Sequence, residues 1–140
     1  NVFVKVPIIF TNKKSTENVN KILTEKKIKL NITAIFSIEQ IEKVLPIIKD
    51  TETILSVFAG RIFDCGQDAN KIMTEICKFV KGESRCKVLW ASPRMPYDYI
   101  SAIECGAQIL SCIVTKKTRI NFTKINDQYG EHASAYKPRR

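Results

Sequence analysis

The 140-residue sequence contains few of the residues from which metal sites, disulfide scaffolds and phosphate loops are built. It has one histidine, His132, and an odd number of cysteines, five, without a Cys-x-x-Cys pair. We therefore expect no zinc site and no disulfide framework, and we interpret all five cysteines as small buried hydrophobic residues in a reducing compartment. These cysteines are Cys65, Cys77, Cys86, Cys105 and Cys112. No glycine-rich phosphate loop occurs, so we expect neither a metal nor a cofactor.

Long hydrophobic runs and a signal-peptide pattern are also missing, so we expect no membrane partner, and the cysteine pattern favours a reducing, cytoplasmic location. The hydrophobic fraction of 44% is typical of a globular protein, and the length suits one ordinary domain. The first residue is Asn, and the sequence opens inside an apolar run with no cap or turn before it. We interpret the sequence as a fragment, a processed product or the second piece of a split protein.

The net charge of +9 would suit a polyanion, but its distribution argues against a nucleic-acid partner. Residues 116–140 hold seven Lys/Arg and two Asp/Glu, whereas residues 1–115 hold sixteen and twelve. The aromatic residues of the basic end are Phe122, Tyr129 and Tyr136, which are too scattered to form a stacking platform. We therefore predict a domain at residues 1–115 and a basic tail of unknown structure at residues 116–140.

Five apolar segments with strand character alternate with four amphipathic segments with helical character. The predicted strands span residues 2–6, 29–36, 54–58, 87–91 and 108–114. This alternation predicts an α/β fold of βαβ units with a parallel sheet.

The predicted helices begin near residue 15 or 16, at Ser37, at Asp68 and near Pro96. Gln40 stands three residues after Ser37, which is the pattern of a capping box, and Pro46 is expected to kink or shorten that helix. The expected inner faces, in chain order, consist of Val19, Ile22 and Leu23; Ile38, Ile41, Val44, Leu45 and Ile48; Ile72, Met73, Ile76, Phe79 and Val80; and Tyr97, Ile100 and Ile103.

A parallel α/β sheet carries its chemistry at the carboxyl ends of its strands, and these ends are rich in a particular set of polar side chains. They offer a lysine, small hydroxyls, an amide, an aromatic ring and two arginines: Lys5, Asn31, Thr33, Ser37, Ser56, Phe58, Arg61, Ser92, Arg94, Ser111 and Thr115. Arginine presents a planar fork that suits phosphate. The carboxylate that follows these strands closely is Asp64, which we interpret as a loop cap rather than a base.

Lys5 stands among apolar and β-branched residues in a segment that we predict to be a buried strand. In a dry pocket the pKa of an ammonium group falls, and the free amine can attack a carbonyl and form a Schiff base. The alternative is a lysine of an edge strand whose apolar stem packs while its ammonium group reaches water.

Four motifs together resemble transaldolases, most closely the short bacterial transaldolase-like subgroup related to the fructose-6-phosphate aldolases. They are Val-Lys-Val-Pro at 4–7, Leu-Asn-Ile-Thr-Ala-Ile-Phe-Ser at 30–37, Ser-Val-Phe-Ala-Gly-Arg-Ile at 56–62 and Ala-Ser-Pro-Arg at 91–94. The resemblance runs from residue 1 to about residue 114. It implies a partial (β/α)8 TIM barrel of five parallel strands alternating with helices, equivalent to barrel strands four to eight.

The resemblance also implies an activity, a transaldolase that moves a dihydroxyacetone unit between sugar phosphates through a Schiff base, as in the pentose phosphate pathway. It implies that Lys5 is the Schiff-base lysine and that Asn31 and Thr33 are polar catalytic-site residues, Thr33 beside a catalytic water. The residues implied on the substrate side are Ser56, Phe58, Arg61, Ser92 and Arg94, with both arginines on phosphate.

Three departures from the family pattern leave alternatives open. Barrel strands one to three, with the family's catalytic aspartate and a water-positioning glutamate, have no counterpart here, and residues 118–140 do not match the family's final helix. Phe58 stands where the fructose-6-phosphate aldolases usually have a tyrosine, which favours transfer over aldol cleavage. The alternatives are a fructose-6-phosphate aldolase-type lyase, or an inert half-barrel that forms homo-oligomers or associates with a missing N-terminal segment.

Overall fold

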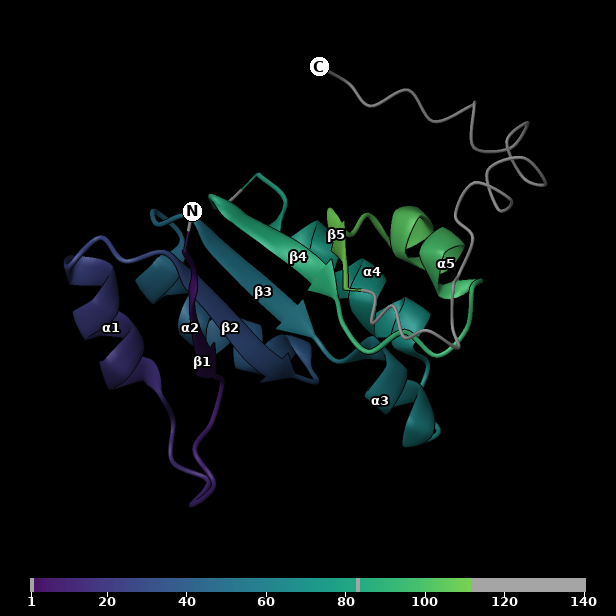
Figure 1. The fold of residues 1–140 in the computed structure, drawn as a ribbon, viewed down its shortest axis with the longest axis horizontal. Helices are drawn as coiled ribbons and strands as arrows, with labels where there is room; N and C mark the ends of the chain where they lie inside the picture. Colours follow the sequence, from purple (N-terminus) through teal and green to yellow (C-terminus); the bar gives the residue numbers. More distant parts are fainter. Residues whose placement is uncertain (1, 83, 112–140) are drawn as a thin grey trace.

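The computed structural model describes residues 2–82 and 84–111, and the predicted tail at 116–140 lies outside them. Five parallel strands form one sheet in the order β1-β2-β3-β4-β5, which confirms the predicted α/β fold (Figure 1). The strands are β1 (Val4–Pro7), β2 (Leu30–Ile35), β3 (Thr53–Val57), β4 (Cys86–Trp90) and β5 (Ile109–Leu110). The helices are α1 (Glu17–Glu25), α2 (Ile38–Ile48), α3 (Ala59–Asp64), α4 (Ala69–Val80) and α5 (Asp98–Cys105).

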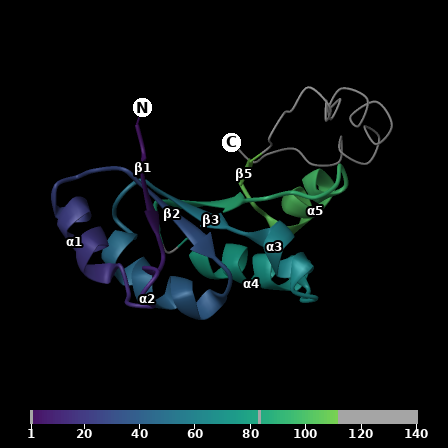
Figure 2. The ribbon, with the colours of Figure 1, turned by 60° about the horizontal axis from the view of Figure 1, so that its bottom comes forward.

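Helices α1, α2 and α4 lie along one face of the sheet, and the other face curves away from them (Figure 2). The helices pack in chain order, α1 on α2, α2 on α4 and α4 on α5. Strands and helices that follow one another in this way, with parallel neighbours, form the repeating unit of a (β/α)8 barrel. The architecture is therefore consistent with a partial TIM barrel.

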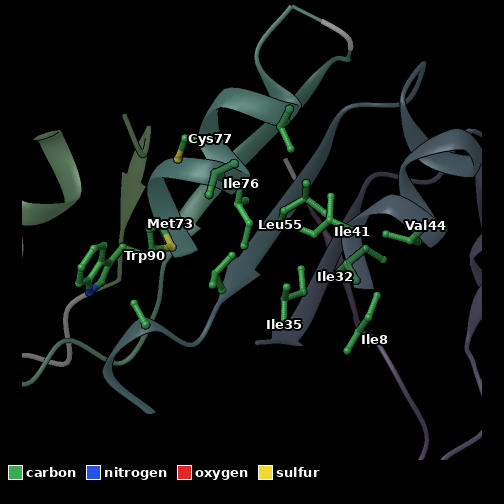
Figure 3. Packing of buried hydrophobic residues seen from close by; sticks show 14 of the residues in the cluster. Ile8, Ile32, Ile35, Ile41, Val44, Leu55, Met73, Ile76, Cys77 and Trp90 are labelled. Carbon is green, nitrogen blue, oxygen red and sulfur yellow. The ribbon is translucent and has the colours of Figure 1, made fainter. Parts of the chain in front are cut away.

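The hydrophobic core lies between the sheet and this helix layer. Ile32, Leu55 and Val88 stand in register on β2, β3 and β4, and all three are fully buried. Their side chains form one cluster with Ile41 of α2 and Ile76 of α4. Figure 3 shows Ile32 and Leu55 of the sheet beside these two helix residues. Each such side chain contributes about 1.5–3 kcal/mol on burial, so this layer holds the helices to the sheet.

Local sequence signals set the beginnings of two helices as predicted. Ser37 and Gln40 form the capping box of α2, and the Gln40 Oε1 atom accepts from the Ser37 N–H at 3.3 Å. The Asp68 carboxylate accepts from the Lys71 N–H at 3.1 Å and caps α4. Pro46 lies inside α2 without ending it, since the helix continues to Ile48.

The predicted inner faces were wrong at three positions. Ile22 is 52% exposed and Tyr97 is 56% exposed, and Phe79 is also exposed. Helix α5 instead buries small residues, among them Ala102 and Cys105, because it packs closely against α4. The apolar stripe of a helix is wider than the part of the helix surface that its neighbours cover. Sequence periodicity therefore overestimates the burial of residues at the edges of the stripe.

The first strand is not buried as predicted. Val2, Val4 and Lys5 are exposed, and in this segment Val6 is buried. The reason is that β1 is at the edge of the sheet and pairs with β2 on one side, among the described residues.

The cysteines also differ from one another. Cys77 and Cys105 are buried as predicted and Cys86 is partly buried, but Cys65, just after α3, is exposed. Cys112 lies outside the described residues. Within the part of the chain that the structure describes, no helix is long and apolar enough to span a bilayer.

Candidate functional site

The face of the sheet opposite the helices carries the predicted lysine. Lys5 of β1 is in register with Asn31 of β2, which is in register with Ile54 of β3. Residues in register on neighbouring strands share a face of the sheet. Successive side chains along β1 point to opposite faces, so Lys5 and the buried Val6 lie on different faces. The Lys5 side chain is therefore exposed on the open face, in a row that continues to Lys87 of β4.

Asn31 is joined on the same face by two further polar residues, Thr33 of β2 and Ser56 of β3. The Ser56 hydroxyl donates to the Asn31 Oδ1 atom at 2.7 Å, and Ser56 itself is buried. Thr33 follows Asn31 by two residues, and within the described residues its buried Oγ1 atom has no hydrogen-bond partner. An unpartnered buried hydroxyl is costly unless a water or ligand meets it, so Thr33 has hydrogen-bonding capacity to offer a bound molecule.

Phe58 and Arg61 lie just beyond the carboxyl end of β3. The Phe58 ring packs edge-on against Phe36, with ring centres 5.7 Å apart, and the Arg61 guanidinium lies 5.8 Å from the centre of the Phe58 ring. This distance is within the range of a cation–π contact. Arg61 belongs to the short helix α3, which sequence reasoning missed because six residues are too few for a helical period to be recognised.

The end of β4 is held against the beginning of α3 by backbone contact. The Gly60 N–H donates to the Ala91 carbonyl at 3.3 Å, and a methyl group built on Gly60 would lie 1.7 Å from the Ser92 carbonyl oxygen. Ser92 has φ of 60°, a left-handed conformation. The tight approach therefore brings the segments that carry Arg61 and Arg94 side by side.

Asp98, the first residue of α5, orders the loop that carries Arg94. Its buried carboxylate accepts from the backbone N–H groups of Arg94 and Met95, the latter at 3.1 Å. Sequence reasoning missed this residue, although an aspartate directly after Pro96 and Tyr97 is a recognisable signal of a helix beginning.

Asp64 is paired with Arg94, so its interpretation as a loop cap was wrong. The Arg94 Nε atom donates to Asp64 Oδ1 at 3.1 Å, and the Nη2 atom donates to Oδ2. The hydrogen bond from Arg94 lowers the pKa of the Asp64 carboxyl, and the Arg94 guanidinium has a raised pKa through the same bond.

Neither of two hollows on the described residues is lined by a predicted site residue. One, of about 330 Å³, lies near the amino ends of the strands between Phe3, Lys29 and Lys87. The other, of about 170 Å³, lies between the connection after β1 and helix α2, beside Asn20. The described residues hold no group of three or more His, Cys, Asp or Glu side chains placed to bind a metal ion.

Comparison with known proteins gives a consistent result. The family model described as Transaldolase/Fructose-6-phosphate aldolase matches residues 1–128. A protein named probable transaldolase from Caldicellulosiruptor saccharolyticus is 32% identical over 111 residues, which are 78% of this chain and 48% of the relative. Probable transaldolases from Herpetosiphon aurantiacus and Methanococcus maripaludis are each 34% identical over 110 residues, again 78% of this chain and 47% and 48% of the relatives. The chain thus spans about half the length of the curated relatives it matches.

Proposed function

Because this chain belongs to the transaldolase/fructose-6-phosphate aldolase family, we propose that its open sheet face carries out Schiff-base chemistry on a sugar phosphate. The reaction is the transfer of a dihydroxyacetone unit from a ketose phosphate to an aldose phosphate, in cytoplasmic metabolism of the pentose phosphate type. The observation that carries the proposal is the alignment of Lys5 with Asn31, which itself bonds Ser56, beside the unpartnered Thr33 hydroxyl.

The first step uses the amine of Lys5 as a nucleophile. The neutral amine attacks the C2 carbonyl of the ketose, and loss of water gives an iminium ion. The iminium accepts the electron pair of the C3–C4 bond as this bond breaks, which leaves an enamine on Lys5 and releases an aldehyde. The enamine then attacks the carbonyl carbon of the second aldehyde, and hydrolysis of the new iminium frees the product and the lysine.

The other site residues bind and orient the substrate in this proposal. Arg61 and Arg94 hold the phosphate, which positions the reacting carbons relative to Lys5. Thr33 is suited to hold the water that leaves and re-enters, because its hydroxyl has no other partner in the described residues. The proton of the C4 hydroxyl requires a base, and the predicted site residues contribute no carboxylate to the described part of this face.

Borohydride trapping tests the proposed nucleophile. Incubation with fructose 6-phosphate and borohydride, followed by peptide mass mapping, is expected to give a reduced adduct on Lys5. The adduct should be absent from Lys5→Met and unchanged in Lys87→Met, which removes an exposed lysine from the same row of the same face. A folded chain that forms no adduct, or that forms it equally on Lys87, would contradict the proposal.

A lyase of the fructose-6-phosphate aldolase type is the second candidate. The side chain at position 58 argues against it, because the Phe58 ring contacts Phe36 and the Arg61 guanidinium and has no hydroxyl with which to move a proton. The two activities separate in one assay that compares release of free dihydroxyacetone with its transfer to erythrose 4-phosphate. We expect transfer to exceed release.

An inert half-barrel that assembles with another chain is the third candidate, and the exposure of Lys5 on the open face is the observation in its favour. This candidate requires the chain to form oligomers or to bind a separate N-terminal segment. A catalytically active monomer would exclude it.

A further inference from the structure

The guanidinium group of Arg94 forms an ion pair with a carboxylate of the protein itself. Its Nε and Nη2 atoms both donate to the carboxylate of Asp64, one to each oxygen. This two-point contact is the geometry by which arginine also binds phosphate. Asp64 therefore uses the edge of Arg94 that suits a phosphate group.

Asp64 is held in this place by the backbone and not by its side chain alone. It is the last residue of α3, and the beginning of α3 is fixed against the end of β4 through Gly60 and Ala91. The buried carboxylate of Asp98 fixes the backbone of Arg94 on the other side of the contact. Arg61, three residues before Asp64 on the same helix, also acts on the Asp64 carboxylate by charge. One carboxylate thus lies in the field of both proposed phosphate ligands.

We infer that Asp64 is an internal competitor for phosphate, which occupies Arg94 in the free protein and is displaced when a phosphorylated sugar binds. The inference rests on the proposed function, because it takes Arg94 as a phosphate ligand. Phosphate can replace Asp64 on Arg94 at low cost, because exposed ion pairs are weak. The side chains of Arg94 and Asp64 are 42% and 51% exposed. Asp64 would lower the affinity for phosphate, prevent repulsion between the two arginines in the empty site and ease product release.

Replacement of the carboxylate by a neutral amide should strengthen phosphate binding. Asp64→Asn keeps the shape of the side chain but loses its charge, so Arg94 is released to the ligand. We expect the dissociation constant for inorganic phosphate to fall by up to about fivefold, the range set by exposed ion pairs. Asp64→Glu keeps the competing charge and should bind phosphate as the natural chain does.

The experiment is an NMR titration of the 140-residue chain with inorganic phosphate, at constant ionic strength, that follows the Nε–Hε signals of the arginine side chains. In the natural chain the Arg94 signal should shift as phosphate replaces Asp64, and in Asp64→Asn it should begin at a different position and saturate at lower phosphate. Glu75→Gln is the matched control, because it removes one exposed negative charge from α4, a different helix from that of Asp64. Its affinity should remain that of the natural chain.

A second comparison assigns the effect to Arg94. In the Arg94→Gln background, Asp64→Asn should strengthen phosphate binding less than it does when Arg94 is present, because the remaining effect of the Asp64 charge on Arg61 is smaller than its direct contact with Arg94. An equal gain in this background, an equal gain from Glu75→Gln, or an unchanged or weaker affinity in Asp64→Asn would each overturn the inference. None of these measurements involves Lys5, so a failure of borohydride trapping and a failure of the competition are distinguishable.

Discussion

Gly60 shows how one residue without a side chain joins two parts of the proposed site. The Ser92 carbonyl fills the space that a β-carbon would take. Glycine is therefore needed at position 60 because the Ser92 backbone packs directly against it. Gly66 has open space around it, and glycine suits that position because its backbone is left-handed, with φ of 73°.

Gly60→Ala is expected to destabilise the fold by about 1–3 kcal/mol, because the backbone of the Ser92 segment must move. The same substitution at Gly66 meets no neighbouring atom and should cost about 1 kcal/mol, from backbone strain alone. Urea denaturation of the two variants measures the difference. Equal costs at the two positions would show that Gly60 is not in close contact with the end of β4.

The described cysteines differ in reactivity because they differ in burial. Burial raises the pKa of the Cys77 thiol to about 12, so almost no thiolate forms at pH 8 in the folded chain. Cys65 is exposed and should be alkylated first by iodoacetamide at pH 8, with Cys77 modified only as the chain unfolds. Peptide mass mapping over time checks the order. Rapid labelling of Cys77 in the folded chain would contradict the packing between α4 and α5.

The same thiol makes stability depend on alkaline pH. The pKa of Cys77 is higher in the folded chain than the ordinary value of 9.0, so the folded state retains a proton that the unfolded state loses. The stability contributed by Cys77 is complete below about pH 9 and declines as the pH rises towards about 12. Denaturation of the natural chain and of Cys77→Ala across this range should show a shallower decline in the variant.

At the scale of the element, α1 is attached by a narrower strip than its apolar residues suggest, whereas the apolar face of α2 is buried along its length. Ile41 of α2 is completely buried against the sheet, whereas Ile22 of α1 is 52% exposed although it lies in the apolar stripe of its helix. Tertiary contact, and not hydrophobicity, separates these two isoleucines.

Ile41→Ala should destabilise the chain by about 2–5 kcal/mol, because it removes buried atoms and leaves a cavity in the core. Ile22→Ala makes the same chemical change at an exposed position and should cost less than about 1 kcal/mol. Thermal denaturation followed by circular dichroism compares the two. A large loss from Ile22→Ala would mean that α1 packs by a different face.

At the scale of the whole molecule, helices α1, α2 and α4 lie along one face of the described sheet, and the opposite face curves away from them (Figure 2). This open face carries the apolar residues Ile54 of β3 and Leu89 of β4, and among the described residues β1 presents a strand edge. Uncovered sheet faces and edges favour association with another chain.

We therefore expect the 140-residue chain to associate with itself as its concentration rises. Leu89→Lys places a charge on the open face and should shift the chain towards monomer in sedimentation velocity. Ile22→Lys adds the same charge on α1, away from that face, and should leave association unchanged. A natural chain that stays monomeric at all concentrations would contradict this prediction.

The sequence by itself determined the order and type of the main elements. Strand-like runs alternate with amphipathic runs, Ser37 and Gln40 mark the start of one helix, and Asp68 marks another. All five predicted strands are present among the described residues, and four of the five described helices were predicted, α3 being the exception. These features depend on residues within a few positions of one another, so they can be read from the chain directly. The motifs around Lys5 and Arg94 likewise indicated the family that the comparison confirmed. The catalytic and binding roles of these residues stay predictions, which the trapping and titration experiments test.

Only the tertiary structure decided which side chains meet. The contact of Asp64 with Arg94 joins residues 30 positions apart, and that of Asn31 with Ser56 joins residues 25 apart. The exposure of Lys5 depends on what covers β1, and the attachment of α3 depends on the approach of Gly60 to Ser92. Periodicity records that a residue is apolar or charged, but contact across such separations depends on the packing of complete elements, which no local pattern specifies.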